Sequence, residues 1–226
     1  MKSETQNVIE RYERRKEKSV VDNNSKNFYF NHFAQSEREL KYIEIIKSRY
    51  DSLDSLKILE IGAGTGINLF LFKKLGLKNE NIYANELLSD RYKLLNDLFP
   101  EINTLKGDAC EIDENLNSSF DIVFQSTVFT SILDYDFKVK LANKMWQLLK
   151  PGGIILWYDF IFDNPQNNDV KGVKKNEIIK LFKNHKRIQF YKTTLAPPIG
   201  RRVRKFYPLF NIFPFLRTHI IGVIEK

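Results

Sequence analysis

Cysteine is nearly absent from this chain of 226 residues, because Cys110 is the only one. A single cysteine excludes an internal disulfide and any metal site built from several cysteines. No apolar run approaches the ~20 residues that a membrane-spanning helix requires. The first residues, Met1 to Lys18, are charged throughout and lack the apolar core of a secretory signal peptide. These absences predict a cytoplasmic location.

Acidic residues are outnumbered, with 28 Asp and Glu against 36 Lys and Arg, so the formal net charge is +8. This excess favours an anionic partner such as nucleic acid, a phosphorylated small molecule or a membrane surface. A chain that is merely soluble and basic explains the same charge, and both interpretations stay open. Apolar residues make up 42% of the chain, which suffices for the core of one α/β domain with a modest extension.

Hydrophobic periodicity divides the chain into an N-terminal helical segment, residues 1–50, and an α/β domain, residues 51–226. In the first segment we expect helices over about 4–18 and 36–50, joined by a loop over 22–33 that is rich in asparagine and aromatic residues. The strands expected in the second are 57–61, 82–86, 102–106, 120–125, 154–160, 187–194 and 218–225. Strands separated by single helices predict a parallel sheet with helices on both faces.

A glycine-rich loop follows the first expected strand, in the sequence Leu59-Glu60-Ile61-Gly62-Ala63-Gly64-Thr65-Gly66. Glycine lets the backbone approach a ligand closely, and such sheets bind ligands beyond the carboxyl ends of their strands. A nicotinamide-binding loop has the spacing G-x-G-x-x-G to receive a pyrophosphate, whereas the third glycine here, Gly66, comes one residue too early. Glu60 would repel a phosphate but suits an ammonium group. The loop therefore favours a cofactor without phosphate.

Two acidic residues end the next two strands. Glu86 is placed to accept hydrogen bonds from both hydroxyls of a ribose, as the acidic residue does in dinucleotide folds. Asp108 is placed to accept one from an adenine amino group. Either residue alone could be an ordinary turn carboxylate, but both in this order after the glycine loop predict an adenosine-containing cofactor.

With these residues the chain resembles class I S-adenosylmethionine-dependent methyltransferases of the type 11/25-like kind. The resemblance is carried by Leu59–Gly66, Glu86, Gly107-Asp108, Phe120-Asp121-Ile122-Val123 and Leu149-Lys150-Pro151-Gly152-Gly153. It implies a Rossmann-like three-layer sandwich, whose seven-stranded, mostly parallel sheet has an antiparallel last strand. It also implies S-adenosylmethionine as cofactor. We expect the N-terminal helical segment to form a lid on this domain.

The resemblance also implies the cofactor-binding residues. They are Glu60, Gly62, Ala63, Gly64, Gly66, Asn68, Glu86, Leu87, Asp108, Ala109, Gln125 and Ser126. Glu60, Gly62 and the backbone near Gln125 would contact the methionine part. The family often has Gly-x-Asp where this chain has Asn85-Glu86, and glutamate can make the same ribose contact.

A narrower resemblance links the chain to a bacterial subgroup associated with surface-polysaccharide and small-molecule biosynthesis. It rests on Arg11-Tyr12-x-Arg14-Arg15, Gln125–Asp134, Trp157-Tyr158-Asp159-Phe160, Asp163-Asn164-Pro165, Leu195-Ala196-Pro197-Pro198 and Pro214–His219. It predicts a small-molecule or glycan acceptor.

Three kinds of methylation are disfavoured. Methylation of base amines usually brings an Asn/Asp-Pro-Pro-aromatic motif after the fourth strand, where this chain has Gln125-Ser126-Thr127-Val128. Methylation of pyrimidine carbons needs a cysteine nucleophile, and we interpret Cys110 as a small buried residue. A catechol-type metal site needs acidic ligands after strands four and five. Asp159, Asp163 and Asn164 supply some of these, but Gln125 replaces the strand-four acid, so we predict no metal. An oxygen or a small amine is left as acceptor.

The candidate catalytic bases are His32, Asp159 and His219. His32 lies in the expected 22–33 loop, which could fold over the site as a lid, although a surface histidine is the plainer interpretation. Asp159 ends the fifth strand and is expected to face the cleft, unless it is only a hydrogen-bonded turn residue. We interpret the third candidate, His219, as mainly structural.

Three basic clusters, Arg11–Lys18, Lys171–Arg187 and Arg201–Lys205, suggest how an acceptor is held. The first and third could meet above the sheet and clamp a carboxylate or phosphate, which predicts an anionic acceptor. The substrate-binding candidates are Arg11, Tyr12, Arg14, Arg15, Tyr29 and Arg201. Aromatic residues follow the third cluster, and this pattern fits either docking on a membrane surface or a segment that covers the core.

Two other functions compete with this one. A tRNA or rRNA methyltransferase would explain the net charge, but the chain lacks an added RNA-binding domain and a base-amine motif, which argues against nucleic acid. A non-catalytic partner that binds S-adenosylmethionine would have the same fold. The oligomeric state is left open.

Overall fold

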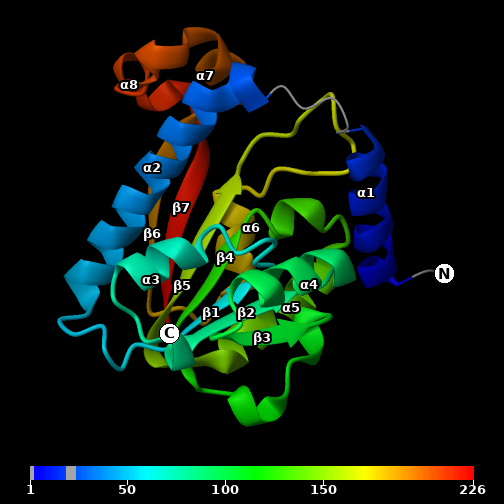
Figure 1. The fold of residues 1–226 in the computed structure, drawn as a ribbon, viewed down its shortest axis with the longest axis vertical. Helices are drawn as coiled ribbons and strands as arrows, with labels where there is room; N and C mark the ends of the chain where they lie inside the picture. The colour runs from blue at the N-terminus through cyan, green and yellow to red at the C-terminus, as the bar shows by residue number, and fades with distance from the viewer. Residues whose placement is uncertain (1–2, 19–23) are drawn as a thin grey trace.

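The computed structural model describes residues 3–18 and 24–226 and shows a seven-stranded sheet between two layers of helices (Figure 1). The strands are β1 Ile58–Ile61, β2 Ile82–Glu86, β3 Asn103–Lys106, β4 Phe120–Ser126, β5 Leu149–Phe160, β6 Arg187–Leu195 and β7 Arg217–Glu225. Their order in the sheet is β3-β2-β1-β4-β5-β7-β6. The first five strands are parallel, and β7 is antiparallel to both β5 and β6. The predicted Rossmann-like sheet with an antiparallel last strand is confirmed.

Helices cover both faces of the sheet. They are α1 Glu4–Lys18, α2 Asn24–Arg49, α3 Leu69–Lys74, α4 Ser89–Leu98, α5 Tyr135–Leu148, α6 Lys175–Leu181, α7 Pro197–Val203 and α8 Tyr207–Phe210. Side chains of α2, α3 and α4 share one buried apolar cluster, whereas those of α5 and α6 share the other. Strand β5 contributes to both clusters, since Ile155 and Trp157 belong to the second, and Leu156 and Tyr158 to the first. Successive side chains of a strand point to opposite faces, which explains this division.

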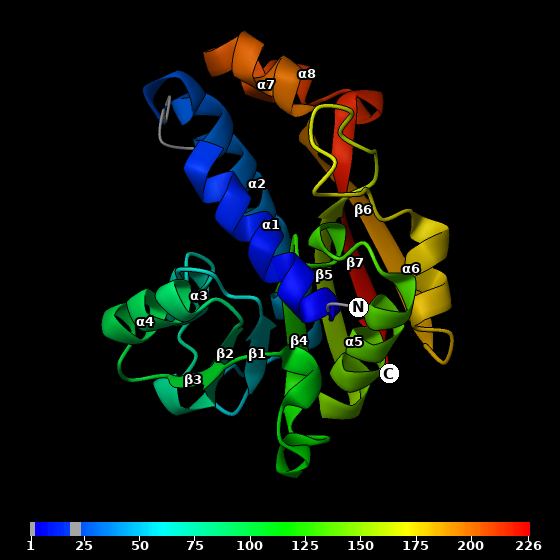
Figure 2. The same cartoon turned by 90° about the vertical axis from the view of Figure 1, so that its right-hand side faces the viewer.

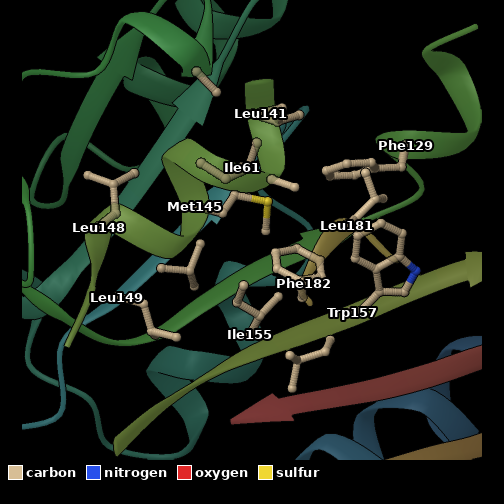
Figure 3. Packing of buried hydrophobic residues seen from close by; sticks show 14 of the residues in the cluster. Ile61, Phe129, Leu141, Met145, Leu148, Leu149, Ile155, Trp157, Leu181 and Phe182 are labelled. Atoms are coloured by element: carbon tan, nitrogen blue, oxygen red, sulfur yellow. The ribbon is translucent and has the colours of Figure 1, made fainter. Parts of the chain in front are cut away.

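The core under α5 shows how a helical repeat in the sequence packs onto the sheet. Leu141, Met145 and Leu148 recur at helical spacing and belong to the same buried cluster as Ile155 and Trp157 of β5 (Figure 3). On the strand, Trp157 packs against Phe182 with ring centroids 6.0 Å apart. The helix begins where the Asp134 carboxylate accepts a hydrogen bond from the backbone N–H of Phe137 at 2.9 Å, a typical N-cap.

The predicted loop over 22–33 is wrong for the residues that the structure describes, because α2 already begins at Asn24 and continues for 26 residues. Asparagine has low helix propensity, and its abundance here hides the apolar spacing of Phe30, Phe33 and Ala34. These three side chains pack on a segment far along the chain. Tertiary packing therefore stabilises a helix that local propensity disfavours.

The segment with which they pack, residues 197–216 between β6 and β7, contains α7 and α8 and is called the cap here. It lies at one end of the molecule beside the first turns of α2 (Figures 1 and 2). The contact is close, since a Cβ added to Gly200 would come within 2.9 Å of Phe30 Cε2. None of the helices in the described ranges is long and apolar enough to cross a membrane.

Candidate cofactor and acceptor site

A pocket of about 480 Å³ lies beyond the carboxyl ends of the parallel strands. Its floor comes from the segments that follow β1, β2, β3 and β4, which is where parallel α/β sheets bind their ligands. Residues of α1, α2, α4 and α5 complete the walls. Nine of the twelve predicted cofactor residues line it: Gly62, Ala63, Gly64, Asn68, Glu86, Leu87, Asp108, Ala109 and Ser126. Glu60, Gly66 and Gln125 lie behind this lining.

Two glycines of the loop after β1 are required for different structural reasons. Gly64 and Gly66 both have positive φ, 61° and 83°, which glycine adopts far more easily than other residues. A Cβ on Gly64 would meet nothing within 4 Å. A Cβ on Gly66 would lie 2.9 Å from Leu95 Cδ1 and closer still to the Phe99 ring, both in the helix α4 region. Gly64 therefore keeps the pocket open, and Gly66 lets α4 pack against the loop.

The Glu86 carboxylate is fixed at the centre of the pocket. It is 4% exposed, and it accepts backbone N–H bonds from Gly64 at 2.7 Å and Leu88 at 2.8 Å, one on each oxygen. A carboxylate oxygen can accept a second bond. The group therefore joins the β1 and β2 loops and keeps acceptor capacity on both oxygens for a pair of hydroxyls.

Helix α1 closes the pocket at the β3 end. The Thr5 hydroxyl donates to Asp108 Oδ2 at 2.7 Å, while Asp108 Oδ1 accepts the N–H of Cys110 at 2.9 Å. Thr5 and Tyr12 of α1 line the pocket beside the predicted adenine-binding residues. The structure thus places the N-terminal helix against the β3 end of the pocket.

Glu60 is a buried carboxylate with one oxygen unused. It is 1% exposed, and its Oε1 accepts a hydrogen bond from Asn68 Nδ2 at 2.6 Å. Its Oε2 has no hydrogen-bond partner among the described residues. Burial raises the pKa of Glu60 to about 8. A cationic donor such as an ammonium group would satisfy the free oxygen and favour the ionised form.

Asp159 is buried behind the pocket and does not line it. Its carboxylate accepts hydrogen bonds from Thr130 Oγ1 at 2.8 Å and Gln125 Nε2 at 3.0 Å. Gln125 in turn accepts the N–H of Val128 through Oε1 at 3.0 Å, so the pair holds the loop after β4. Burial raises the pKa of Asp159 to about 7. A catalytic role for Asp159 stays a prediction.

Tyr158 and Arg38 line the pocket at its β5 end, and the sequence interpretation missed both. Arg38 Nη1 donates to the Tyr158 hydroxyl at 3.2 Å, and the guanidinium lies 4.6 Å from the ring centroid. Tyr158 pairs in register with Ser126, a predicted site residue. Because in-register neighbours share a sheet face, alternation from Ser126 would have selected Tyr158 instead of Asp159.

Arg38 also had a signal in the sequence. It lies four and seven residues before the buried Tyr42 and Ile45, so it belongs to the buried stripe of α2. A charged residue on a buried stripe is costly unless it has a hydrogen-bonding or ion-pair partner. Its hydrogen bond and its ring contact are both with Tyr158, and within the described residues no ion pair with a carboxylate accompanies them.

The other predicted residues lie elsewhere. His32 is an exposed residue of helix α2, not of a loop, and stacks on Phe28 at 5.8 Å. His219 is buried against Tyr158, and burial lowers its pKa to about 3, consistent with a structural role.

Of the six predicted substrate residues, only Tyr12 lines the pocket. Arg11 and Arg14 form ion pairs with Glu4 and Asp169. Arg15 stacks on the Tyr12 ring at 4.1 Å. Tyr29 is exposed on α2 beside the cap. Arg201 is an exposed residue of the cap, and its guanidinium lies 5.7 Å from the centroid of the Phe30 ring.

Residues 58–153 match the family model described as a methyltransferase domain. The chain carries a class I S-adenosylmethionine-dependent methyltransferase domain. Its cofactor is S-adenosylmethionine. The contacts of Glu86 with the ribose hydroxyls, of Asp108 with the adenine amine and of Glu60 with the ammonium group stay predictions. No curated protein sequence matches the chain.

Solved structures share the fold of this methyltransferase. A SAM-dependent methyltransferase from Archaeoglobus fulgidus is 16% identical, with a TM-score of 0.57 over 88% of this chain and 100% of that one. A SAM-dependent methyltransferase from Methanosarcina mazei is 14% identical, with a TM-score of 0.58 over 80% of this chain and 96% of that one. A third structure is the 1,6-didemethyltoxoflavin-N1-methyltransferase of Burkholderia thailandensis with S-adenosylhomocysteine bound. It is 15% identical, with a TM-score of 0.56 over 76% of this chain and 72% of that one.

We expect S-adenosylhomocysteine binding to the methyltransferase to release about one proton near pH 7. Glu60 is largely protonated in the free protein at that pH, because its pKa is about 8. Pairing with an ammonium group favours the carboxylate and lowers this pKa, so the proton leaves. Calorimetry in buffers of different ionisation enthalpy counts the protons. Glu60→Gln should release none, and equal release from both proteins would contradict the assignment.

Proposed function

We propose that the protein transfers the methyl group of S-adenosylmethionine to an oxygen or small amine of an anionic small-molecule or glycan acceptor. When bound, the cofactor supplies a methyl group on a sulfonium, which an acceptor lone pair takes by in-line displacement. The observation that carries the proposal is Arg38, a guanidinium in the pocket wall with no carboxylate partner among the described residues. We infer that an anionic group of the acceptor pairs with it.

The strand order supports placing the acceptor at this end. Of the adenosine-side residues, Asp108 follows β3 and Glu86 ends β2, whereas Tyr158 lies in β5. In the order β3-β2-β1-β4-β5, these ends are four strand spacings apart, roughly 19 Å. The glycine loop after β1 lies between them. The cofactor would therefore run from β3 toward β4, and the acceptor would meet its methyl group near Arg38 and Tyr158.

The charge of this end also favours an anion. A guanidinium close to a cationic sulfonium is electrostatically unfavourable unless an anion lies between or beside them. Tyr158 is held by two hydrogen bonds, one with Arg38 and one with Thr194 Oγ1 at 3.1 Å, so its hydroxyl is positioned by the protein. An acceptor bound here would be oriented on two sides, which is what methyl transfer chiefly requires.

The lining residues at this end include hydroxyl groups, such as those of Tyr158 and Thr127, but neither histidine nor carboxylate within the described part of the chain. This favours an acceptor whose attacking atom needs no strong base: a carboxylate, an acidic hydroxyl or an amine. His32 and Asp159 stay predictions as bases, since neither lines the pocket.

We expect Arg38→Met to raise the acceptor KM by roughly 10- to 150-fold, the range for losing a hydrogen bond to a charged group. Labelled methyl transfer to a panel of carboxylates, phosphates, neutral sugars and tRNA would first identify an acceptor. Lys47→Met, an exposed change on the same helix, is the matched control. Preference for neutral sugars, or an unchanged KM, would contradict the proposal.

A second measurement separates acceptor from cofactor. If Arg38 instead binds the carboxylate of the cofactor, Arg38→Met should weaken S-adenosylhomocysteine but not 5′-methylthioadenosine, which lacks the amino-acid part. We expect both ligands to bind the variant as they bind the unaltered protein. Transfer to tRNA would favour the RNA alternative, and absence of turnover on every acceptor would favour the non-catalytic one.

A further inference from the structure

The cap exposes several large apolar side chains to solvent. The docking face consists of Phe206, Leu209, Phe210, Ile212, Phe213 and Phe215. Leu209 is 59% exposed, Ile212 65% and Phe215 75%. Apolar side chains exposed singly are ordinary, but six of them within residues 206–215 are typical of an interaction surface.

The inner side of the same segment is firmly attached to the protein. Tyr207 is 2% exposed, stacks on Phe33 at 5.6 Å and donates its hydroxyl to Glu37 at 3.0 Å. Val203 and Leu216 pack on the same small core. The cap is therefore two-sided, and its apolar outer residues are held outward by a fixed inner layer.

Positively charged residues adjoin the docking face in the chain. Arg201, Arg202, Arg204 and Lys205 are all exposed and precede it directly. No acidic residue occurs in the chain between Glu177 and Glu225. In a shallow depression, Arg202, Arg204 and Lys205 adjoin Phe206 and Phe210 of the docking face. Apolar side chains that can insert among acyl chains, beside cations that can meet phosphate headgroups, match the two layers of an anionic membrane surface.

We propose that the docking face binds peripherally to an anionic lipid membrane. A second copy of the chain fits less well, because a two-fold contact would bring the same arginines against each other. The helices of the cap are short, seven residues in α7 and four in α8, so the contact is made by side chains of a folded cap. A long amphipathic helix lying in the bilayer surface is not required.

The test is sedimentation of the full chain with vesicles. We expect binding to vesicles of phosphatidylcholine mixed with phosphatidylglycerol, little binding to phosphatidylcholine alone, and a decline of binding with added salt. Equal binding to both vesicle types, or none to the anionic ones, would overturn the proposal.

Two sets of variants test the two parts of the surface. Replacing Arg201, Arg202 and Lys205 together by glutamine should weaken binding to anionic vesicles roughly 100-fold, at about five-fold for each cation. The matched control, Lys74, Lys78 and Lys93 to glutamine, removes the same charge from exposed sites elsewhere and should bind normally. If both triple variants lose binding equally, net charge alone explains it and the docking face is not the site.

The apolar part is tested by Leu209→Ser with Ile212→Ser, against Leu98→Ser, which is 52% exposed on α4. We expect the first pair to lose binding and the control to keep it. Sedimentation velocity of the same proteins without lipid monitors self-association, and a dimer that the first pair abolishes would favour a second copy as the occupant. None of these measurements involves methyl transfer, so failure of the membrane proposal can be distinguished from failure of the proposed acceptor.

Discussion

Replacing Glu86 by alanine should weaken S-adenosylhomocysteine binding by about 10- to 150-fold for each charge-assisted hydrogen bond that is lost. The carboxylate holds the N–H groups of Gly64 and Leu88, and we assign its remaining acceptor capacity to the ribose. The alanine variant therefore loses both the ligand contacts and the connection that positions the glycine loop. Binding that is barely detectable by calorimetry is the expected result.

Two further variants make this result interpretable. Glu86→Gln keeps one oxygen acceptor without the charge, so its affinity should lie between those of the alanine variant and the unaltered protein. Glu114→Ala removes an exposed carboxylate and should bind normally. If Glu86→Ala is folded and binds S-adenosylhomocysteine with unchanged affinity, the ribose assignment is wrong.

Gly66→Ala should destabilise the protein far more than Gly64→Ala. Both changes force a non-glycine residue to positive φ, which costs about 1–2 kcal/mol. Only at Gly66 does the new Cβ also meet a packed neighbour, 2.9 Å from Leu95, and such overpacking costs about 1–3 kcal/mol more. For a domain of this size the sum lowers Tm by roughly 5–20 °C.

Gly64→Ala should affect ligand binding more than thermal stability. Its Cβ enters open space at the pocket, so Tm should fall by only roughly 2–8 °C, while S-adenosylhomocysteine binding weakens. Thermal melts with and without ligand measure both quantities. Equal losses of Tm in the two variants would show that backbone strain alone decides the outcome and that the contact of Gly66 with α4 is unimportant.

The sheet and the glycine loop could be predicted because their signals are local. Strands with buried residues on both faces are nearly continuous apolar runs, and β5 shows this over Ile154 to Tyr158. Loop glycines and acids at strand ends then gather at one edge of a parallel sheet by topology alone. That is why Glu86 and Asp108, distant in sequence, both line the pocket.

The parts that depend on distant contacts could not be predicted this way. The first turns of α2 are helical because Phe30 and Phe33 pack against the cap, whose own short helices have no helical repeat long enough to recognise. Arginine clusters were equally ambiguous. Arg11 and Arg14 suggested an acceptor clamp, but their partners Glu4 and Asp169 are protein carboxylates. Arg38, an isolated arginine in a helix, lines the pocket instead.

The position of β7 between β5 and β6 governs when the sheet can be completed during synthesis. β6 leaves the ribosome before β7, yet within the described structure its strand partner is β7. Until β7 emerges, one edge of β5 and all of β6 lack backbone partners, and exposed edges of apolar strands promote aggregation. The half of the sheet from β3 to β5 can assemble on the nascent chain, whereas the other half must wait.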